Sequence, residues 1–498
     1  MIKGDRRVRP ALMTGVALAG LVLGAGAANA QSVLGVNGPR LDAAELEDAR
    51  HRDVMLDPRE VLNERHGGTI LDPTQLLDER HVRAPALGTE IETYVGQVDI
   101  QDESQIVISL PGTPTTARDP VNINGIGQMI VSTPGAGGGV SLGLCTGTLI
   151  NPRTVLFAAH CVNNRPATAY GSASGGVAIG FGFNNSNNTT QPGQPAGTSP
   201  LLNWLFGSAA QGRAPNTTST SEFFYTVNGL VYNPLSLEPA AAGFLYGDVA
   251  IASLDTPARN IPTWAILLSA LTPPSQITAA NGTGYHVTIS GYGANGIGTT
   301  GATGAIDYRR RVAENWLGAL TSLNVRDTFL FGGFSVSRPQ NLYWIDFDDP
   351  RRGTPQASPF DFNVFRDNAL PNEGTTSGGN SGGPLILDRT FAQQVVIGVL
   401  SGGSRFFGAQ PGSSYGTASF YQPIYLYWDW IAANNPYRYV GAVAGSGNWE
   451  DPTRWVSLQD PNYFIIGANG QLVNGVPTRP GEQNLGTSGQ FGDLCVQG

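Results

Sequence analysis

Charged residues, cysteine and histidine are all scarce in this chain of 498 residues. Charged side chains make up only 13% of it, against 41% hydrophobic residues and 66 glycines. This composition disfavours a helical cytosolic protein and favours a loop-rich, mainly β, exported one. The glycines follow no three-residue period, which excludes a collagen-like helix. The length allows more than one domain.

Long hydrophobic runs are also missing after the first 30 residues, so no membrane span is expected there. Residues 1–30 combine a basic start, a mostly apolar stretch from Ala11 to Ala28, and small residues in Ala28-Asn29-Ala30. This pattern is typical of a secretory signal peptide that is cleaved before Gln31. A membrane anchor is the alternative, but the Gly/Ala-rich run is short for one. A secreted or periplasmic protein is therefore predicted.

The charge balance argues against one class of partner. Cleavage before Gln31 removes four basic residues and one acidic residue, so the net charge of −9 becomes −12. An acidic surface of this kind disfavours nucleic acid as a partner.

Cysteine is limited to three positions. Cys145 and Cys161 flank a short segment and can pair in an oxidising compartment. Cys495 is left over, so it is either a free thiol or the site of a disulfide to another chain.

Histidine occurs five times, and three copies (His51, His66 and His81) belong to a 15-residue repeat. The repeat lies within residues 31–100, and its Asp-Pro starts predict short helices. Metal binding is the alternative, but the histidines lie far apart, and each follows an arginine near a helix C-terminus, where positive charge is favourable. We interpret the segment as a propeptide or an interaction arm.

Of the other two histidines, His286 lies in an alternating run typical of a strand, which leaves His160 as the one histidine that neither the repeat nor this run explains. No cofactor and no metal site are expected.

Short apolar runs between glycines predict strands at residues 127–131 and 146–150, and the aromatic stretch from Tyr421 to Ala433 predicts a helix.

Three segments carry the residues of nucleophilic catalysis: Val155–Cys161, Gly247–Leu254 and Gly378–Leu385. A serine hydroxyl needs an adjacent base, and histidine suits that task near neutral pH. A carboxylate holds the imidazole in one tautomer. Backbone N–H groups must also face the developing oxyanion, and the glycine-rich turn would supply those of Gly379 and Ser381.

Taken together, these segments resemble the trypsin/chymotrypsin family of serine proteases. Ala158–Cys161 matches its Ala-Ala-His-Cys motif, Asp248 opens an Asp-Val-Ala-Ile strand, and Gly379–Pro384 matches Gly-Asp-Ser-Gly-Gly-Pro with one change. The resemblance implies a secreted serine endopeptidase acting on proteins or peptides, with His160, Asp248 and Ser381 as its catalytic triad. It also implies a Cys145–Cys161 disulfide. The implied fold is mainly β: a chymotrypsin-like double β-barrel over about residues 120–435, with long loop inserts, preceded by the helical repeats.

One departure from the family concerns activation. Asn380 stands where digestive members carry an aspartate that pairs with a newly cut N-terminus, and no Ile-Val-Gly-Gly-like start precedes Val121. A neutral amide cannot form that ion pair. The domain is therefore expected to be active as folded, or to be restrained by residues 31–100.

The resemblance also suggests where substrate binds. Thr375 occupies the base of the primary pocket, where trypsin-like members carry an aspartate, so preference for lysine or arginine is not expected. Ser401, Gly402 and Gly403 resemble the strand that binds the substrate backbone, with the two glycines leaving the pocket entrance open. Leu400 stands where glutamate-preferring relatives often carry histidine. Cleavage after neutral or apolar residues is predicted.

The C-terminal residues 441–498 form a Gly-rich segment, for which β structure is expected. Gly445–Trp455 and Gly475–Gly481 resemble the start of a bacterial autotransporter passenger region, although an ordinary Gly-rich extension is the alternative.

Three other functions remain open: a catalytically inactive binding protein of the protease fold, an esterase, and a structural cell-surface protein. The intact triad argues against the first, and the missing Gly-x-Ser-x-Gly pattern argues against an α/β-hydrolase esterase.

Overall fold

The protein is mainly β, with 41% strand and 10% helix. The computed structural model describes residues 91–94, 106–134, 140–171, 177–187, 200–205, 222–238, 247–272, 282–304, 306–322, 341–363, 365, 367–407 and 409–477. The predicted signal peptide, the repeat histidines and Cys495 lie outside this range. Within it, no helix is long and apolar enough to cross a membrane.

Residues 91–94 form a strand, although they fall within the segment predicted to be helical. Strand β1 (Ile91–Tyr94) pairs antiparallel with β4, and Ile91 lies opposite Gly143. Its sequence, Ile-Glu-Thr-Tyr, is rich in β-branched and aromatic residues and lacks the Asp-Pro helix start of the repeats. The helical boundary placed at residue 100 is therefore wrong for these residues.

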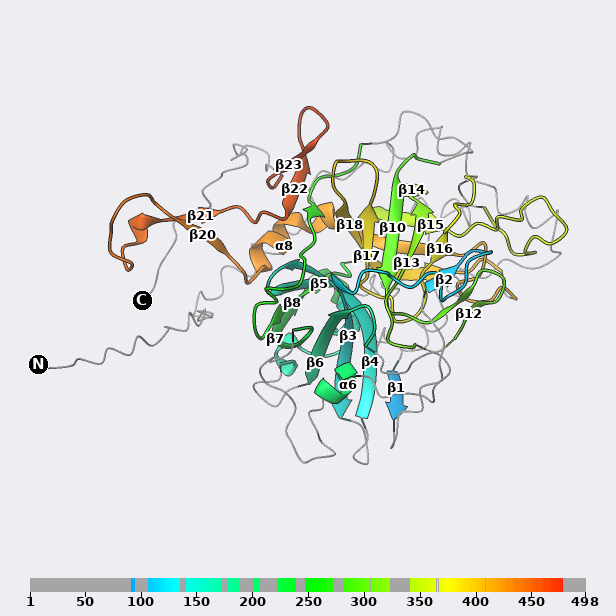
Figure 1. Cartoon of the computed structure of the whole chain (residues 1–498), viewed down its shortest axis with the longest axis horizontal. Coiled ribbons are helices and arrows are strands. Elements are labelled where there is room, and N and C mark those ends of the chain that lie inside the picture. Colours follow the sequence, from blue (N-terminus) through cyan, green and yellow to red (C-terminus); the bar gives the residue numbers. More distant parts are fainter. Residues whose placement is uncertain are drawn as a thin grey trace, which may run out of the picture. The chain divides into compact units, whose positions relative to one another are not determined.

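The first sheet closes into a six-stranded barrel (Figure 1). Around the ring the strands follow the order β4-β3-β6-β7-β8-β5, and neighbouring strands pair antiparallel. The ring is closed because β4 pairs with both β3 and β5. The strands predicted at residues 127–131 and 146–150 are confirmed as parts of two of its longest members. Besides β1, which extends one edge, the strands are β3 (Ile123–Pro134), β4 (Val140–Asn151), β5 (Thr154–Phe157), β6 (Ala178–Asn184), β7 (Phe224–Tyr232) and β8 (Ala250–Leu254).

The second sheet has ten strands, and its main path runs β13-β10-β17-β18-β19-β15-β14. The first and last strands of this path are consecutive in the chain, separated only by Leu317 and Gly318. The strands are β9 (Ile266–Leu267), β10 (His286–Gly291), β13 (Arg311–Trp316), β14 (Ala319–Ser322), β15 (Asn341–Asp346), β17 (Pro384–Leu387), β18 (Val395–Ser404), β19 (Ala418–Pro423), β22 (Tyr463–Ile466) and β23 (Leu472–Asn474).

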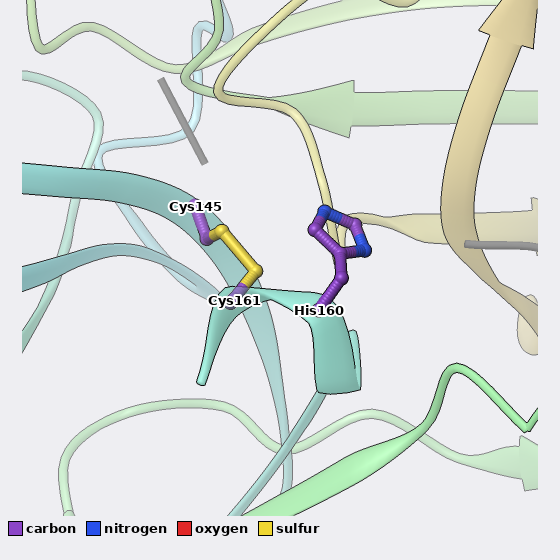
Figure 2. Close-up of side chains that lie close together, drawn as sticks. All are labelled: Cys145, His160 and Cys161. Carbon is purple, nitrogen blue, oxygen red and sulfur yellow. A yellow bond between two sulfur atoms is a disulfide. The ribbon is translucent and has the colours of Figure 1, made fainter. Parts of the chain in front are cut away.

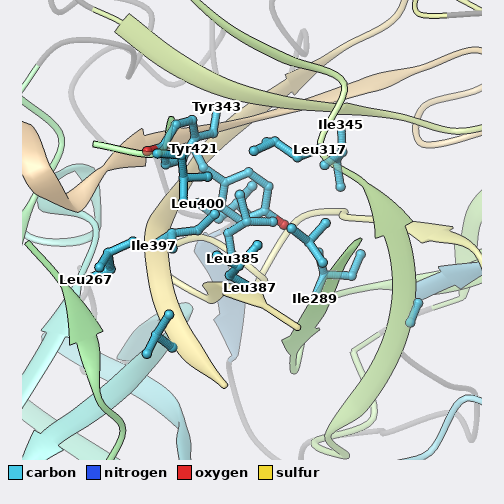
Figure 3. Packing of buried hydrophobic residues seen from close by; sticks show 14 of the residues in the cluster. Leu267, Ile289, Leu317, Tyr343, Ile345, Leu385, Leu387, Ile397, Leu400 and Tyr421 are labelled. Carbon is cyan, nitrogen blue, oxygen red and sulfur yellow. The ribbon is translucent and has the colours of Figure 1, made fainter. Parts of the chain in front are cut away.

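An apolar core is built on the strands of this second sheet (Figure 3). Alternate residues of a strand point to the same face, so Leu385 and Leu387 enter the core together and meet Ile289, Ile397 and Tyr421. All five are at least 98% buried. Burying an aliphatic side chain of this size stabilises the fold by roughly 1.5–3 kcal/mol, which anchors β17 directly after the predicted nucleophile turn.

The remaining described elements are two small sheets and short helices. The helix predicted from Tyr421 begins later than expected, because residues up to Pro423 complete β19 and only then does the chain turn helical. The elements are β2 (Ile106–Ile108), β11 (Asn295–Ile297), β12 (Gly301–Gly304), β16 (Gly374–Thr375), β20 (Tyr439–Ala442), β21 (Trp455–Leu458), α6 (Pro200–Leu205), α8 (Trp428–Asn434) and the 3₁₀ turns η2 (Ala159–Cys161), η3 (Ala167–Ala169), η6 (Pro234–Leu237), η8 (Ile424–Tyr427) and η9 (Pro452–Arg454).

The C-terminal segment contains β strands, and part of it joins the second sheet. Strand β22 pairs in parallel with β9, so Tyr463 lies opposite Ile266. Asp460 accepts hydrogen bonds from the side-chain amides of Asn151 and Asn435, both at 3.3 Å. The domain boundary predicted at residue 441 therefore does not separate β22 and β23 from the preceding residues. Strands β20 and β21 form a hairpin of their own.

Candidate active site

His160 lies in a tight turn that follows a fully buried strand. Strand β5 leads into Ala158 and then into the 3₁₀ turn η2, whose residues Ala159, His160 and Cys161 are all buried. A disulfide joins Cys161 to Cys145 on β4, as the family resemblance implied. Figure 2 shows the disulfide beside the imidazole of His160. The turn is thus tied to the barrel wall, which limits the positions that the imidazole can adopt.

The two sulfur atoms and the imidazole lie within 4.8 Å of one another. Because both thiols are consumed in the disulfide, these three residues are not a metal site.

Asp248 holds His160 at two points. Its Oδ2 lies 2.7 Å from His160 Nδ1, and its Oδ1 accepts a hydrogen bond of 2.7 Å from the backbone N–H of His160. Both side chains are about 99% buried. An ionised carboxylate accepts hydrogen bonds only, so Nδ1 carries the ring proton and Nε2 has the lone pair that a general base requires.

The side chain of Ser401 supports Asp248. The serine is fully buried, and its hydroxyl donates a hydrogen bond of 2.6 Å to Asp248 Oδ2. The strand containing Ser401 was predicted to bind the substrate backbone, and this stays a prediction, because the hydrogen bond to Asp248 uses the side chain and not the backbone of Ser401. Ser401 belongs to β18 of the second sheet, so this hydrogen bond links the second sheet to the loop that precedes β8 of the barrel.

A chain of polar side chains continues behind Ser401. Gln422 Nε2 donates to Ser401 Oγ at 3.2 Å, and Tyr427 OH donates to Gln422 Oε1 at 2.8 Å. The hydroxyl of Tyr427 also accepts a hydrogen bond of 3.2 Å from the N–H of Gly247, the residue before Asp248. This series of hydrogen bonds therefore begins and ends beside Asp248. Sequence reasoning did not identify Gln422 or Tyr427, because no motif or spacing relates them to Asp248. Their contacts orient the carboxylate through Ser401 and through the backbone.

The Ser381 turn packs against the backbone that leads to His160. The carbonyl of Ser381 accepts a hydrogen bond of 2.8 Å from the N–H of Thr146. Gly382 follows with a φ of +82°, and a Cβ there would lie only 2.8 Å from the backbone nitrogen of Ala158. Glycine is therefore required at residue 382, both for its positive φ and for this close approach. Ala158 precedes His160 by two residues, so the turn and the histidine segment are in direct contact.

Two backbone N–H groups of the turn match the predicted oxyanion donors. Gly379 has a φ of +88°, a conformation that glycine adopts readily. The neighbouring amides are occupied, because Asn380 N donates to Ser377 O at 3.1 Å and Gly383 N donates to Asn380 O at 2.8 Å. Within the described ranges, by contrast, the N–H groups of Gly379 and Ser381 donate to no backbone carbonyl. Their role as donors to a substrate oxygen stays a prediction.

Asn380 is held by uncharged neighbours. Its Oδ1 accepts a hydrogen bond of 2.9 Å from the N–H of Gly293, and its Nδ2 donates to Ser377 Oγ at 3.2 Å. The side chain is 99% buried. Its hydrogen bonds hold the turn in place with neutral partners.

We expect Asn380→Asp to lower stability and to leave peptide hydrolysis unchanged or reduced. The carboxylate would lose the hydrogen bond that Nδ2 donates and would place an unpaired charge in a buried site, at a cost of roughly 1–3 kcal/mol. Urea unfolding of the purified variant measures this loss. Higher activity in the variant would contradict the account, because it would show that the turn needs a charge at residue 380.

Thr375, predicted to lie at the base of the primary pocket, is next to a second hydroxyl group. Thr375 is 99% buried, and its Oγ1 lies 3.0 Å from Ser419 Oγ. A Cβ added to Gly402 would meet no atom within 4 Å, whereas a Cβ at Gly403 would lie 3.0 Å from the carbonyl of Ala418 on β19. That these two glycines leave the entrance of a substrate pocket open stays a prediction.

Comparison with known proteins adds no family assignment. No protein-family model matches the chain, and no curated protein sequence matches it.

Proposed function

We propose that the chain is a serine endopeptidase that hydrolyses peptide bonds through an acyl-enzyme. Ser381 is the nucleophile, His160 the general base and Asp248 the residue that orients the imidazole. The observation that carries the proposal is the two-point contact between Asp248 and His160, combined with the packing of the Ser381 turn on Ala158. A carboxylate that fixes a buried histidine beside a glycine-rich serine turn is the arrangement that serine activation requires.

A chymotrypsin-like double barrel is the fold that we propose for this site. One six-stranded barrel is present. The second sheet has the connectivity of another, since β13 and β14 are separated by two residues and pair with β10 and β15, at opposite ends of its path. His160 and Asp248 belong to the first sheet or its loops, whereas Ser381 directly precedes β17 of the second. This placement supports catalysis where the two sheets meet.

The reaction follows from the roles of these groups. Ser381 Oγ attacks the scissile carbonyl carbon while His160 Nε2 takes the hydroxyl proton. The N–H groups of Gly379 and Ser381 stabilise the oxyanion of the tetrahedral intermediate. As the C–N bond breaks, His160 returns the proton to the leaving amine, and an acyl-enzyme forms on Ser381. Water then attacks the ester with His160 again as the base, and the acid product and the serine are released.

Export to an oxidising compartment is part of the proposal. It is supported by the signal-peptide pattern of residues 1–30 and by the disulfide between Cys145 and Cys161. The proposed substrates are proteins and peptides. For residues 441–498 we retain the proposal of an autotransporter-like passenger start.

We expect the purified protein to cleave peptides with Ala, Val, Leu or Phe before the scissile bond at least about tenfold faster, in kcat/KM, than matched peptides with Lys or Glu. The reason is that Thr375 and Ser419 offer hydroxyl groups but no charge that could pair with a charged side chain. A peptide panel analysed by mass spectrometry measures both rate and cleavage position. Preference for Lys would contradict the pocket assignment, and no cleavage of any peptide would favour an inactive binding protein.

A further inference from the structure

Three aspartates meet in the interior at the end of β15, away from the proposed triad in the sequence. Asp346 is the last residue of β15, Asp348 follows it by two residues, and Asp367 comes from the later part of the same loop. Each offers a carboxylate oxygen, and these oxygens lie within 4.8 Å of one another. Each side chain is about 99% buried. Buried carboxylates at this separation repel one another strongly unless a positive charge lies among them.

The surrounding charges do not balance this group. Glu373 adds a fourth buried carboxylate, and its Oε1 accepts a hydrogen bond of 2.7 Å from the N–H of Asp348. Arg352 contacts Asp348, but its guanidinium is shared with Asp361.

Asp367 supplies a second and independent observation. Both of its carboxylate oxygens are buried, and neither accepts a hydrogen bond from a nitrogen donor, so the polar group within reach is another carboxyl of the cluster, that of Asp348. Its backbone is fixed, because its carbonyl accepts from Arg352 Nη1 at 3.1 Å and from Asn363 Nδ2 at 2.8 Å. The side chain of Asp367 therefore brings a carboxylate oxygen into the cluster from a fixed backbone position. A buried polar group without a partner is costly, and a bound ion removes that cost.

We propose that Asp346, Asp348 and Asp367 bind a hard divalent cation of the Ca²⁺ type. Carboxylate oxygens are the preferred ligands of Ca²⁺, which tolerates irregular geometry and takes further oxygens from backbone carbonyls or water. The described residues of the cluster include no histidine and no cysteine, so the donor set does not favour Zn²⁺ or Cu²⁺. The cation would join the end of β15 to the later part of the loop around Asp367.

The site has a consequence for the proposed protease, and this step rests on the proposed function. Glu373 contacts the backbone of Asp348 and directly precedes β16, which contains Thr375. The carbonyl of Glu373 also accepts a hydrogen bond of 2.7 Å from the N–H of Ser109. The loop that would carry the cation therefore leads straight into the pocket residue and the Ser381 turn. We expect loss of the cation to reduce peptide hydrolysis by loosening this segment.

Calcium binding is tested on the purified full chain without reference to catalysis. After treatment with EGTA, the protein is titrated with CaCl2 by calorimetry, and its thermal unfolding is followed with and without millimolar CaCl2. Saturating CaCl2 should raise the Tm of the wild type by roughly 5 °C or more. Asp367→Asn should weaken binding by at least about tenfold and lose most of this shift. In EGTA the same variant should melt at or above the wild-type Tm, because one buried charge is gone.

The matched control is Asp451→Asn, since Asp451 lies in the separate β20–β21 hairpin segment and should leave the calcium effect unchanged. Three results would overturn the site: no effect of CaCl2 on the wild type, an equal effect on Asp367→Asn, or an equal loss of stability in that variant with EGTA and with CaCl2. Because binding and Tm are measured without substrate, an inactive protein that still binds Ca²⁺ would refute the proposed function and keep the site. Protease activity that is insensitive to EGTA, in a protein that binds Ca²⁺, would refute the effect of the cation on catalysis and keep both the site and the proposed function.

Discussion

Replacing Ser381 with alanine is expected to abolish peptide hydrolysis while the fold is preserved. The change removes one hydroxyl, and the hydrogen bond from Thr146 N to the carbonyl of residue 381 does not depend on the side chain. Without the nucleophile no acyl-enzyme forms, and turnover should fall by a factor on the order of 10⁴–10⁶. The measurement is kcat on the best peptide of the panel, with circular dichroism and Tm to verify folding.

Ser446→Ala is the matched control, because Ser446 is an exposed serine of the C-terminal segment. It should keep wild-type kcat and Tm. If Ser381→Ala retained a tenth or more of wild-type activity in an equally pure preparation, another residue would have to be the nucleophile.

Replacing Asp248 with asparagine is expected to reduce kcat by a factor on the order of 10⁴. The carboxylate accepts three hydrogen bonds, from His160 Nδ1, from the His160 backbone N–H and from Ser401 Oγ. An amide has one acceptor oxygen and one donor nitrogen, so it cannot accept all three in this geometry. A donor facing the ring would favour the tautomer with the proton on Nε2, where the general base needs its lone pair.

Ser401→Ala tests how much of this effect depends on the orientation of Asp248. It removes one of the three hydrogen bonds and leaves both contacts with His160, so a loss of only about tenfold is expected. Asp451→Asn should change nothing. If Ser401→Ala were as severe as Asp248→Asn in steady-state kinetics, with Tm unchanged, Ser401 would have to act in the reaction itself.

The sequence predicted those parts of the site that lie in short local motifs. His160 beside Cys161, Asp248 at the start of a buried strand and Ser381 among glycines are each recognisable within a few residues. The structure places the first two in contact and packs the turn of the third against the first segment. The strands around residues 127–131 and 146–150 were predictable for the same reason, since apolar runs between glycines are local signals.

Features that depend on tertiary contacts could not be predicted. Ser401 was assigned to binding of the substrate backbone, but the role of its side chain was not foreseen, because only the folded structure shows the hydrogen bond to Asp248. The role of β22 was missed because pairing with β9 joins segments that are far apart in the chain. The same holds for Asp346, Asp348 and Asp367. Their stretch is visibly rich in aspartate, but only the fold brings the three carboxylates together.

Labelling with a fluorophosphonate, followed by peptide mapping, tests the proposed function most directly. These reagents react covalently with a serine hydroxyl that a neighbouring base has activated. We predict stoichiometric modification at Ser381, none at Ser446, and loss of labelling in Asp248→Asn, for which the imidazole is no longer held as a base. Failure of the folded, wild-type protein to label, or labelling at a serine other than Ser381, would contradict the proposal that this chain is a serine endopeptidase built on His160, Asp248 and Ser381.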